Sequence, residues 1–256
     1  MGQVITLQVS LLITHYNRSN SLKRLLEAFK EQKCSFEEIV ISDDGSKPEH
    51  LNVLKALQSE YNFRLITSEK NKGLGNNINK GQESVKTPFT LYVQEDFRPT
   101  ANFPEHFREA LEIMQTDSQW DIIRLYAYGA YPYLKPYGKG FSEMVFNHWN
   151  LKAGKLHYYS DHPHLRKSDF LEKFGRYAEG PNPVRTEYLK CVAFIQKKGR
   201  GLFYNDYKSL FIQENSSAEP STWQKKSWKT SKNPVVAFGR SIYRQIKYNY
   251  DINFLK

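Results

Sequence analysis

Cysteine is scarce in this chain, and the sequence contains no long apolar run and no internal repeat. Its two cysteines, Cys34 and Cys191, lack the close spacing of a metal-binding motif, and they indicate a reducing compartment rather than a disulfide scaffold. No apolar run approaches the ~20 residues of a membrane-spanning helix. The first residues also lack the charged-then-apolar pattern of a secretion signal. We therefore expect a cytoplasmic protein.

Positive charge and aromatic side chains are abundant instead. The chain has 37 Lys and Arg residues against 27 Asp and Glu residues, a net charge of +10, and 14% of its 256 residues are aromatic. A basic balance suits a phosphorylated substrate, anionic lipid or nucleic acid, although it can also serve solubility alone. Because no basic helix carries the interleaved aromatic residues of a nucleic-acid module, we expect no nucleic-acid partner.

Short apolar runs alternate with amphipathic segments in the first half of the chain. The runs predict strands over residues 9–14, 39–42, 64–67, 89–93 and 121–125. Apolar residues at helical spacing predict helices over about 22–32, 51–61 and 107–114, with a further helix ending near residue 85. This alternation predicts an α/β fold, in which helices flank a Rossmann-like, mostly parallel sheet.

The second half of the chain has a weaker pattern. Residues 126–137 hold five tyrosines and predict a long aromatic loop, which could stack a sugar ring or simply pack. The segment 157–169 carries His162 and His164, and we expect both histidines in a plain surface loop. A helix is predicted over 187–197, followed by a polar, basic linker over 216–233 and an amphipathic tail helix from 235.

Acidic side chains follow two of the predicted strands directly. Asp43 and Asp44 come after the run 39–42, and Glu95 with Asp96 comes after the run 89–93. Parallel strands bring their carboxyl ends to one edge of a sheet, where open α/β folds bind ligands. Adjacent buried carboxylates are costly unless a ligand, cation or donor needs them. The alternative for Asp43 and Asp44 is an Asx turn that leads into the next helix.

Four motifs in this order resemble glycosyltransferase family 2, the inverting nucleotide-sugar transferases with one Rossmann-like catalytic domain. They are the strand and turn 10–18, the strand end 43–46, the Asn-Lys-Gly-Leu-Gly run 71–75 and the acidic segment 91–99. The resemblance is close over residues 7–100 and loose over 155–205. It implies a nucleotide-sugar donor, most simply a UDP-sugar, and a glycan or lipid-linked acceptor in surface polysaccharide biosynthesis.

The resemblance also implies roles for individual residues. The donor nucleotide would contact Thr14, Tyr16, Asn17, Arg18, Asp43, Asp44, Asn71, Gly73 and Glu95. Asp96 would hold a divalent ion, Mn²⁺ or Mg²⁺, on the donor diphosphate. Glu187 would be the base that deprotonates the acceptor hydroxyl, with Glu179 and Asp161 as alternatives.

Two positions depart from the family pattern. Gln94 replaces the first acidic residue of the metal motif, and Tyr188 stands where an aspartate is expected after Glu187. These departures keep a non-catalytic nucleotide- or glycan-binding relative open as an alternative. A nucleotidyltransferase is a weaker alternative, because the turn after the first strand has no glycine-rich phosphate loop.

The resemblance and the charge pattern together predict a division of the chain. A catalytic domain would cover 1–215, with its nucleotide-binding half over about 1–100 and its acceptor half over about 101–215. A basic extension would cover 216–256, where Lys and Arg alternate with Trp, Phe, Tyr and Ile. This composition suits peripheral contact with an anionic membrane, on the inner face of the cell membrane, or a helix packed on the catalytic domain.

Overall fold

A mixed, mostly parallel sheet forms the centre of the protein. The computed structural model describes residues 7–150, 152–180, 182–214 and 234–255. The sheet contains β1 (Leu7–His15), β2 (Phe36–Asp43), β3 (Arg64–Thr67), β4 (Phe89–Gln94), β6 (Ile122–Arg124), β7 (Leu134–Gly138), β8 (Phe141–Met144), β9 (His164–Lys167) and β10 (Gly201–Tyr204). Their order is β3-β2-β1-β4-β9-β6-β10-β8-β7, and β1 to β4 are parallel to one another. The predicted fold class is confirmed.

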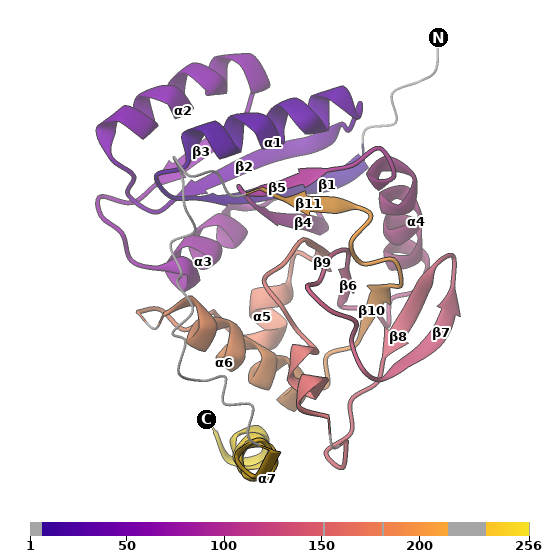
Figure 1. Cartoon of the computed structure of the whole chain (residues 1–256). Coiled ribbons are helices and arrows are strands. Elements are labelled where there is room, and N and C mark those ends of the chain that lie inside the picture. The colour runs from indigo at the N-terminus through magenta and orange to yellow at the C-terminus, as the bar shows by residue number, and fades with distance from the viewer. Residues whose placement is uncertain (1–6, 151, 181, 215–233, 256) are drawn as a thin grey trace.

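Helices cover both faces of the sheet (Figure 1). One face carries α1 (Ser19–Glu31), α2 (Pro48–Tyr61) and α4 (Phe103–Thr116), and the other carries α3 (Leu74–Ser84), α5 (Phe170–Phe174) and α6 (Pro183–Gln196). Successive side chains of a strand point to opposite faces. Accordingly, Leu11 and Ile13 join the first core with α1, while Leu12 joins the second core with α3.

Local sequence accounts for where these helices begin and what they bury. In α1, Leu22, Leu25 and Phe29 recur at helical spacing and are buried against the sheet. In α6, the Asn182 side chain caps the helix by accepting a hydrogen bond of 3.0 Å from the backbone N–H of Arg185. Pro183 follows the cap, where its missing N–H costs nothing. The start of α6 is thereby fixed, and Glu187 lies in its second turn.

The expectation of a surface loop over 157–169 is wrong for most of the segment, because residues 158–161 are buried as well as the strand that follows. Residues 164–167 form β9, which lies between β4 and β6 and is antiparallel to both. His164 and Arg166 are fully buried there. Arg166 is accommodated because Gln82 Oε1 accepts from its Nε and Nη2 at 3.0 and 2.7 Å, and Tyr177 accepts from its Nη1 at 2.6 Å. Long-range partners therefore allow a polar sequence to form a central strand.

The second half contains further strands that the sequence did not predict. The end of the expected tyrosine-rich loop is β7, which pairs with β8 as an antiparallel hairpin. A separate two-stranded sheet joins β5 (Phe97–Pro99) to β11 (Phe211–Gln213). This small sheet brings the end of the predicted catalytic region back to the acidic segment after β4.

The predicted tail helix is present as α7 (Pro234–Phe254). It packs on α6 and on the short 3-10 helix η1 (Ala153–His157), at the bottom of the molecule in Figure 1. Among the residues that the structure describes, no helix has the length and apolar character to cross a membrane. The predicted linker 216–233 lies outside the described residues, and the domain division at 215 stays a prediction.

Candidate functional site

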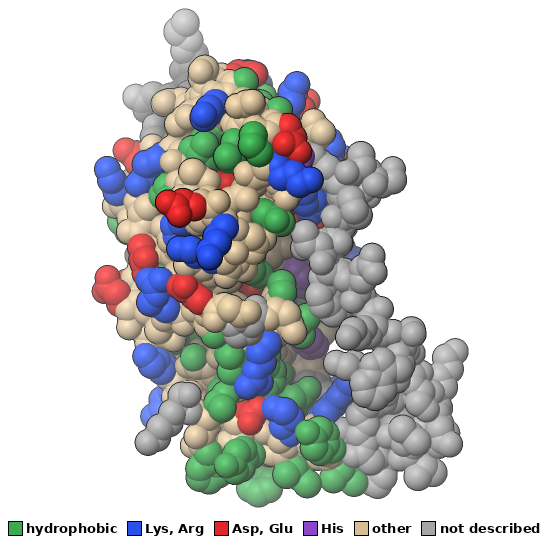
Figure 2. All heavy atoms as spheres, turned by 90° about the vertical axis from the view of Figure 1, so that its left-hand side faces the viewer, with side chains coloured by type: hydrophobic (Ala, Val, Ile, Leu, Met, Phe, Trp, Pro, Cys, Tyr) green, Lys and Arg blue, Asp and Glu red, His purple; other side chains and the backbone are tan. Residues whose placement is uncertain are grey.

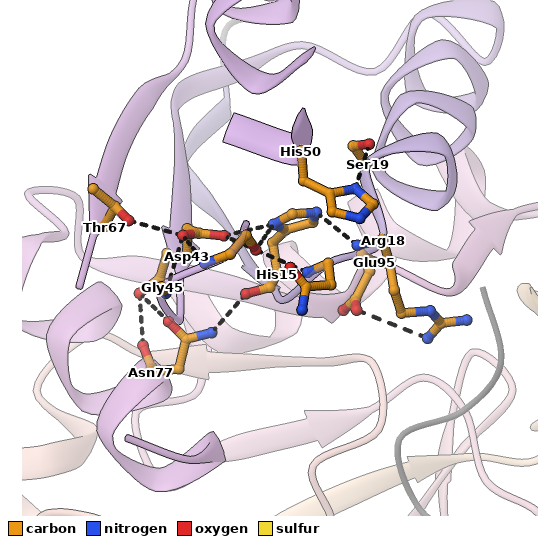
Figure 3. Close-up of polar contacts among 12 residues, drawn as sticks. His15, Arg18, Ser19, Asp43, Gly45, His50, Thr67, Asn77 and Glu95 are labelled. Carbon is orange, nitrogen blue, oxygen red and sulfur yellow. Dashed lines mark hydrogen bonds and ion pairs between the residues drawn. The ribbon is translucent and has the colours of Figure 1, made fainter. Parts of the chain in front are cut away.

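The carboxyl ends of β1, β2 and β4 bring the predicted polar motifs to one edge of the sheet. In the parallel register, His15 is opposite Asp43 and Thr14 is opposite Gln94. The turn after β1, the two aspartates after β2 and the acidic pair after β4 are therefore neighbours, as the sequence predicted. Figure 3 shows His15, Arg18, Asp43 and Glu95 within one polar network.

Asp43 is a fully buried carboxylate whose two oxygens are both used inside the protein. Its Oδ1 accepts from His15 Nδ1 at 2.7 Å and from Ser46 Oγ at 2.5 Å. Its Oδ2 accepts from Thr67 Oγ1 at 2.8 Å and from the backbone N–H groups of Gly45 and Ser46 at 3.1 and 3.0 Å. Burial would raise the pKa of Asp43, but these donors outweigh it and hold the pKa well below its ordinary value.

The partner of Asp43, His15, has a defined tautomer in this network. Its Nε2 accepts from the backbone N–H of Arg18 at 3.2 Å, so the ring proton lies on Nδ1 and faces Asp43. The imidazole thereby links the strand end to the turn that follows it (Figure 3). The turn is further fixed at Asn17, which has a positive φ of 52° and whose Oδ1 accepts from the backbone N–H of Lys47 at 2.8 Å.

Asp44 ties the Asn-Lys-Gly loop to the same edge. Its Oδ1 accepts from the backbone N–H of Lys72 and its Oδ2 from that of Gly73, each at 2.9 Å. Asn71 Oδ1 also accepts from Gly73 N at 3.0 Å, and Gly73 caps α3 with a φ of 89° that favours glycine. Burial raises the pKa of Asp44 above its ordinary value. A carboxylate offers about four lone-pair positions, so Asp44 keeps capacity to accept from a ligand.

Asp96 has one carboxylate oxygen that no described residue reaches with a hydrogen bond. Its Oδ2 accepts from Gln213 Nε2 at 2.9 Å and lies 3.3 Å from Arg18 Nη1. Its Oδ1 is buried, and no hydrogen-bond donor in the described part of the chain reaches it. Glu95 lies beside it, with Oε1 at 3.8 Å from Arg18 Nη1. A buried acceptor without a donor among the described residues is a place for an ion or ligand group.

The remaining predicted nucleotide contacts line this edge or support it. Thr14 is buried, and its hydroxyl is 3.0 Å from the hydroxyl of Tyr92. Tyr16 is half-buried in the turn after β1. Arg18 is buried between the acidic pair and the start of α1.

Glu187 is held by the polar segment before β9. Its Oε1 accepts from Ser160 Oγ at 2.6 Å and from the backbone N–H of Asp161 at 3.2 Å. Ser160 Oγ is also 3.0 Å from His162 Nδ1. The His162 ring contacts Tyr128, with ring centroids 4.4 Å apart. Glu187 therefore belongs to a continuous polar and aromatic path toward the sheet edge.

Tyr128 lies within electrostatic reach of both Asp96 and Glu187. Although 62% of Tyr128 is exposed, its partial burial raises its pKa most, the two carboxylates raise it further, and a hydrogen bond to Gln213 lowers it. That hydrogen bond joins the hydroxyl of Tyr128 to Gln213 Oε1 at 2.7 Å. Gln213 thus bridges Tyr128 and Asp96, and the predicted metal ligand and predicted base lie on one side of the protein.

The two alternative bases have different environments. Glu179 accepts from Asn76, Asn79 and Arg176, and these interactions lower its pKa to about 2. Asp161 is buried, and burial together with the neighbouring Glu187 carboxylate raises its pKa above the ordinary value. Its Oδ1 accepts from Tyr159 at 2.7 Å, and its Oδ2 is buried with no donor among the described residues.

The comparisons with known proteins decide the family. Residues 10–175, well over half of the chain, match the sequence profile described as Glycosyl transferase family 2. The chain belongs to this family.

Curated relatives and solved structures agree with the assignment to family 2. The chain is 28% identical over 89 residues to the cholesterol galactosyltransferase of Borreliella burgdorferi, covering 35% of this chain and 25% of that protein. It is 25% identical over 91 residues to the teichoic acid poly(glycerol phosphate) polymerase of Staphylococcus epidermidis, covering 35% and 13%. These matches span a quarter or less of the relatives' lengths.

Two solved structures share the fold of this family 2 chain. A crystal structure of S. aureus TarS 1-349 in complex with UDP-GlcNAc has a TM-score of 0.64 and 14% identity, covering 95% of this chain and 72% of that one. The mannosyltransferase PcManGT from Pyrobaculum calidifontis, in complex with GDP-Man and Mn²⁺, has a TM-score of 0.57 and 10% identity, covering 97% and 64%. At these identities the likeness shows the fold.

Tyr188, the departure from the family 2 pattern after Glu187, has a structural role in this chain. Its hydroxyl donates to Asp251 Oδ2 of α7, and the same oxygen accepts from Lys247 Nζ. Its ring also lies against that of Tyr248, with centroids 5.9 Å apart. The tyrosine therefore fastens α7 to α6 one residue away from Glu187.

Sequence reasoning missed Gln213 and gave Tyr128 no individual role in this family 2 site. Tyr128 lay inside a run of tyrosines whose members looked alike. Gln213 reaches Asp96 through the pairing of β11 with β5, two strands more than a hundred residues apart in the chain. In the sequence, Gln213 is only a polar residue at the end of a short apolar run. Most strand ends have such a residue, so this pattern does not indicate a role in the site.

Proposed function

We propose that this family 2 protein transfers a sugar from a UDP-sugar donor to a glycan or lipid-linked acceptor, with inversion, in surface polysaccharide biosynthesis. The observation that carries the proposal is the buried Oδ1 of Asp96, which has no hydrogen-bond partner among the described residues, at the edge where Asp44 also lies. Structural relatives that bind UDP-GlcNAc or GDP-Man with Mn²⁺ support a nucleotide-sugar at this edge. Relatives in galactosyl transfer and teichoic acid synthesis support the setting.

Asp44 is the better of the two aspartates for accepting hydrogen bonds from the donor base or ribose. Asp43 already accepts five hydrogen bonds and is fully buried, so a ligand would have to displace one of its donors. Asp44 is buried too, at 3% exposure, but it accepts two, one on each oxygen, so a further donor need not displace these. In this proposal Asp43 fixes the strand end, and Thr14, Tyr16, Asn17, Asn71 and Gly73 shape the pocket around the nucleotide.

Asp96 and Glu95 fit a divalent ion that is shared with the donor diphosphate. The described residues contain no group of three or more His, Cys, Asp or Glu side chains arranged around a metal. Magnesium and related hard cations commonly take one or two protein carboxylates and complete their shell with phosphate oxygens and water. The free Oδ1 of Asp96 suits this arrangement, with Gln213 and Arg18 orienting the other oxygen. Bound Mn²⁺ or Mg²⁺ would stabilise charge on the leaving diphosphate.

Glu187 would remove the proton from the acceptor hydroxyl as that oxygen attacks the anomeric carbon. The Ser160 hydroxyl and the backbone N–H of Asp161 donate hydrogen bonds to its Oε1 and orient it. Inversion requires the acceptor to attack from the face opposite the diphosphate, so the base and the metal ligand must flank the donor sugar. The charges of Asp96 and Glu187 both raise the pKa of Tyr128, so in this proposal its ring would lie between the two carboxylates and contact a sugar.

Turnover with a panel of nucleotide-sugars tests this proposal. We expect Mn²⁺- or Mg²⁺-dependent release of UDP from one UDP-sugar when an acceptor is added, and at least about a hundredfold loss in Asp96→Asn. The anomeric configuration of the product, read by NMR, would be opposite to that of the donor. Nucleotide binding without release by any sugar donor would contradict the transferase assignment and establish the non-catalytic binding alternative.

A further inference from the structure

The helix α7 presents a stripe of large apolar side chains to the surroundings. We call Ile242, Tyr243, Ile246, Tyr250 and Phe254 the α7 stripe; their exposed fractions are 45, 65, 68, 61 and 68%. Four of them recur at intervals of four residues and therefore follow one side of the helix. Figure 2 shows apolar side chains gathered at the bottom of the molecule, the end where Figure 1 places α7. A continuous exposed apolar surface of this kind marks an interaction site.

The other side of α7 already holds the helix in place. Asp251 accepts from Tyr188 and from Lys247, and Ile252 is buried in the second core. Gln196 of α6 donates to the backbone carbonyl of Leu255 at 2.7 Å. The α7 stripe is therefore not needed for docking on α6, and no described residue covers it.

Trp149 extends the apolar surface beyond the helix. It is 88% exposed, and the loop that carries it lies against α7, because the carbonyl of Asn150 accepts from Gln245 at 3.1 Å. Lys155 strengthens this contact by donating to the His148 carbonyl at 2.7 Å and to Asn249 at 3.1 Å. In Figure 1 this loop reaches the same end of the molecule as α7. Tryptophan and tyrosine are the side chains that favour the interface between lipid and water.

Charge favours a lipid surface over a second copy of the chain. Residues 216–256 contain eight Lys and Arg against two Asp and Glu, so this segment carries most of the net charge of +10. Two copies meeting through this segment would oppose like charges. An anionic bilayer instead attracts basic residues that flank an apolar helix face.

We propose that the α7 stripe and Trp149 dock the protein on an anionic lipid bilayer, with α7 lying in the plane of the interface. The inference rests on the proposed function, in which the acceptor is lipid-linked. It adds which surface of the protein faces the lipid. Because α7 is fastened to α6 beside Glu187, docking would also hold the predicted catalytic base at a fixed height above the bilayer.

Flotation with vesicles tests the inference on the full chain without nucleotide. We expect binding to phosphatidylcholine vesicles that contain phosphatidylglycerol, weaker binding to pure phosphatidylcholine, and loss of binding as salt is raised. Ile246→Ser should lower the affinity by about tenfold, and Trp149→Ala should lower it similarly. The matched control is Val53→Ser, which changes an exposed apolar residue on α2, at the far end of the molecule in Figure 1.

Three outcomes would overturn the inference. They are no binding to anionic vesicles, equal binding by Ile246→Ser and the wild type, or a dimer in light scattering that Ile246→Ser dissociates. The last result would assign the α7 stripe to a second copy of the chain. Release of UDP from a UDP-sugar in the absence of vesicles is measured in parallel, so a failure of membrane docking is distinguishable from a failure of the transferase assignment.

Discussion

Replacing Asp43 by alanine should damage the fold before it damages ligand binding. The substitution removes the acceptor of five hydrogen bonds in a fully buried position. His15, Ser46 and Thr67 would each lose a side-chain partner, and the turn after β2 would lose the two backbone contacts that close it. His15 and Ser46 are buried and stay away from water while the sheet edge stays packed, whereas the exposed Thr67 can turn to water.

The expected cost follows from what remains unpaired. Removing one member of a buried charged network costs about 3–5 kcal/mol, because the donors left behind stay desolvated without an acceptor. One kcal/mol lowers the melting temperature of a domain of this size by about 2–4 °C. Asp43→Ala should therefore lower Tm by on the order of 10 °C.

Asp44→Asn provides the contrasting variant. An amide oxygen can keep one of the two backbone hydrogen bonds that Asp44 accepts, so we expect a stability loss of about 1 kcal/mol. If Asp44 accepts a hydrogen bond from the donor nucleotide, the same variant should also weaken UDP affinity. The loss should be about 10- to 100-fold, which corresponds to the free energy of one hydrogen bond to a charged group. Thermal unfolding and calorimetric titration of both variants measure the two effects separately.

Either of two results would refute this division of roles. If Asp43→Ala unfolds within about 2 °C of the wild type and yet no longer binds UDP, Asp43 contacts the ligand and its internal network is dispensable. If Asp44→Asn binds UDP as the wild type does, Asp44 serves only to close the loop at Lys72 and Gly73.

Three further predictions concern the base, the tail helix and pH. Glu187→Gln should lower kcat by about 10²- to 10⁴-fold and leave UDP affinity unchanged. If kcat and UDP affinity fall by equal factors, Glu187 binds the donor instead. Tyr188→Phe should free α7 from α6 at a cost of about 1 kcal/mol, seen as faster hydrogen exchange in α7, whereas the exposed control Tyr243→Phe should leave exchange unchanged. The pKa of Asp43 in the folded protein is below its ordinary value of about 3.9, so its carboxylate stabilises the fold above that pH, and this stabilisation is lost as the pH falls below it. Asn at this position does not titrate. Below pH ~4, Tm should therefore fall less steeply in Asp43→Asn than in the wild type.

The sequence predicts the nucleotide-binding half well because its signals are local. Each apolar run between residues 9 and 93 is short, is bounded by turn residues and alternates with an amphipathic segment, so strands and helices follow without tertiary information. The same order places Asp43, Asp44 and Asp96 at strand ends, and parallel pairing brings them to one edge.

The second half could not be predicted in this way because its strands depend on distant partners. Arg166 is compatible with a buried strand only when Gln82 and Tyr177 accept from its guanidinium group, and Gln82 is 84 residues away in sequence. Likewise, Tyr188 looked like a missing aspartate, whereas its contact with Asp251 depends on where α7 docks. Neither relation leaves a periodic pattern in the sequence.

Calorimetric titration of nucleoside diphosphates into the full chain, with and without Mn²⁺, tests the central claim most directly. We expect UDP to bind in preference to GDP, CDP, dTDP and ADP, with Mn²⁺ raising its affinity and Asp96→Asn abolishing that Mn²⁺ effect. Equal, metal-independent binding of all five nucleotides, or no binding of any, would contradict a nucleotide-sugar site built from Asp44 and Asp96.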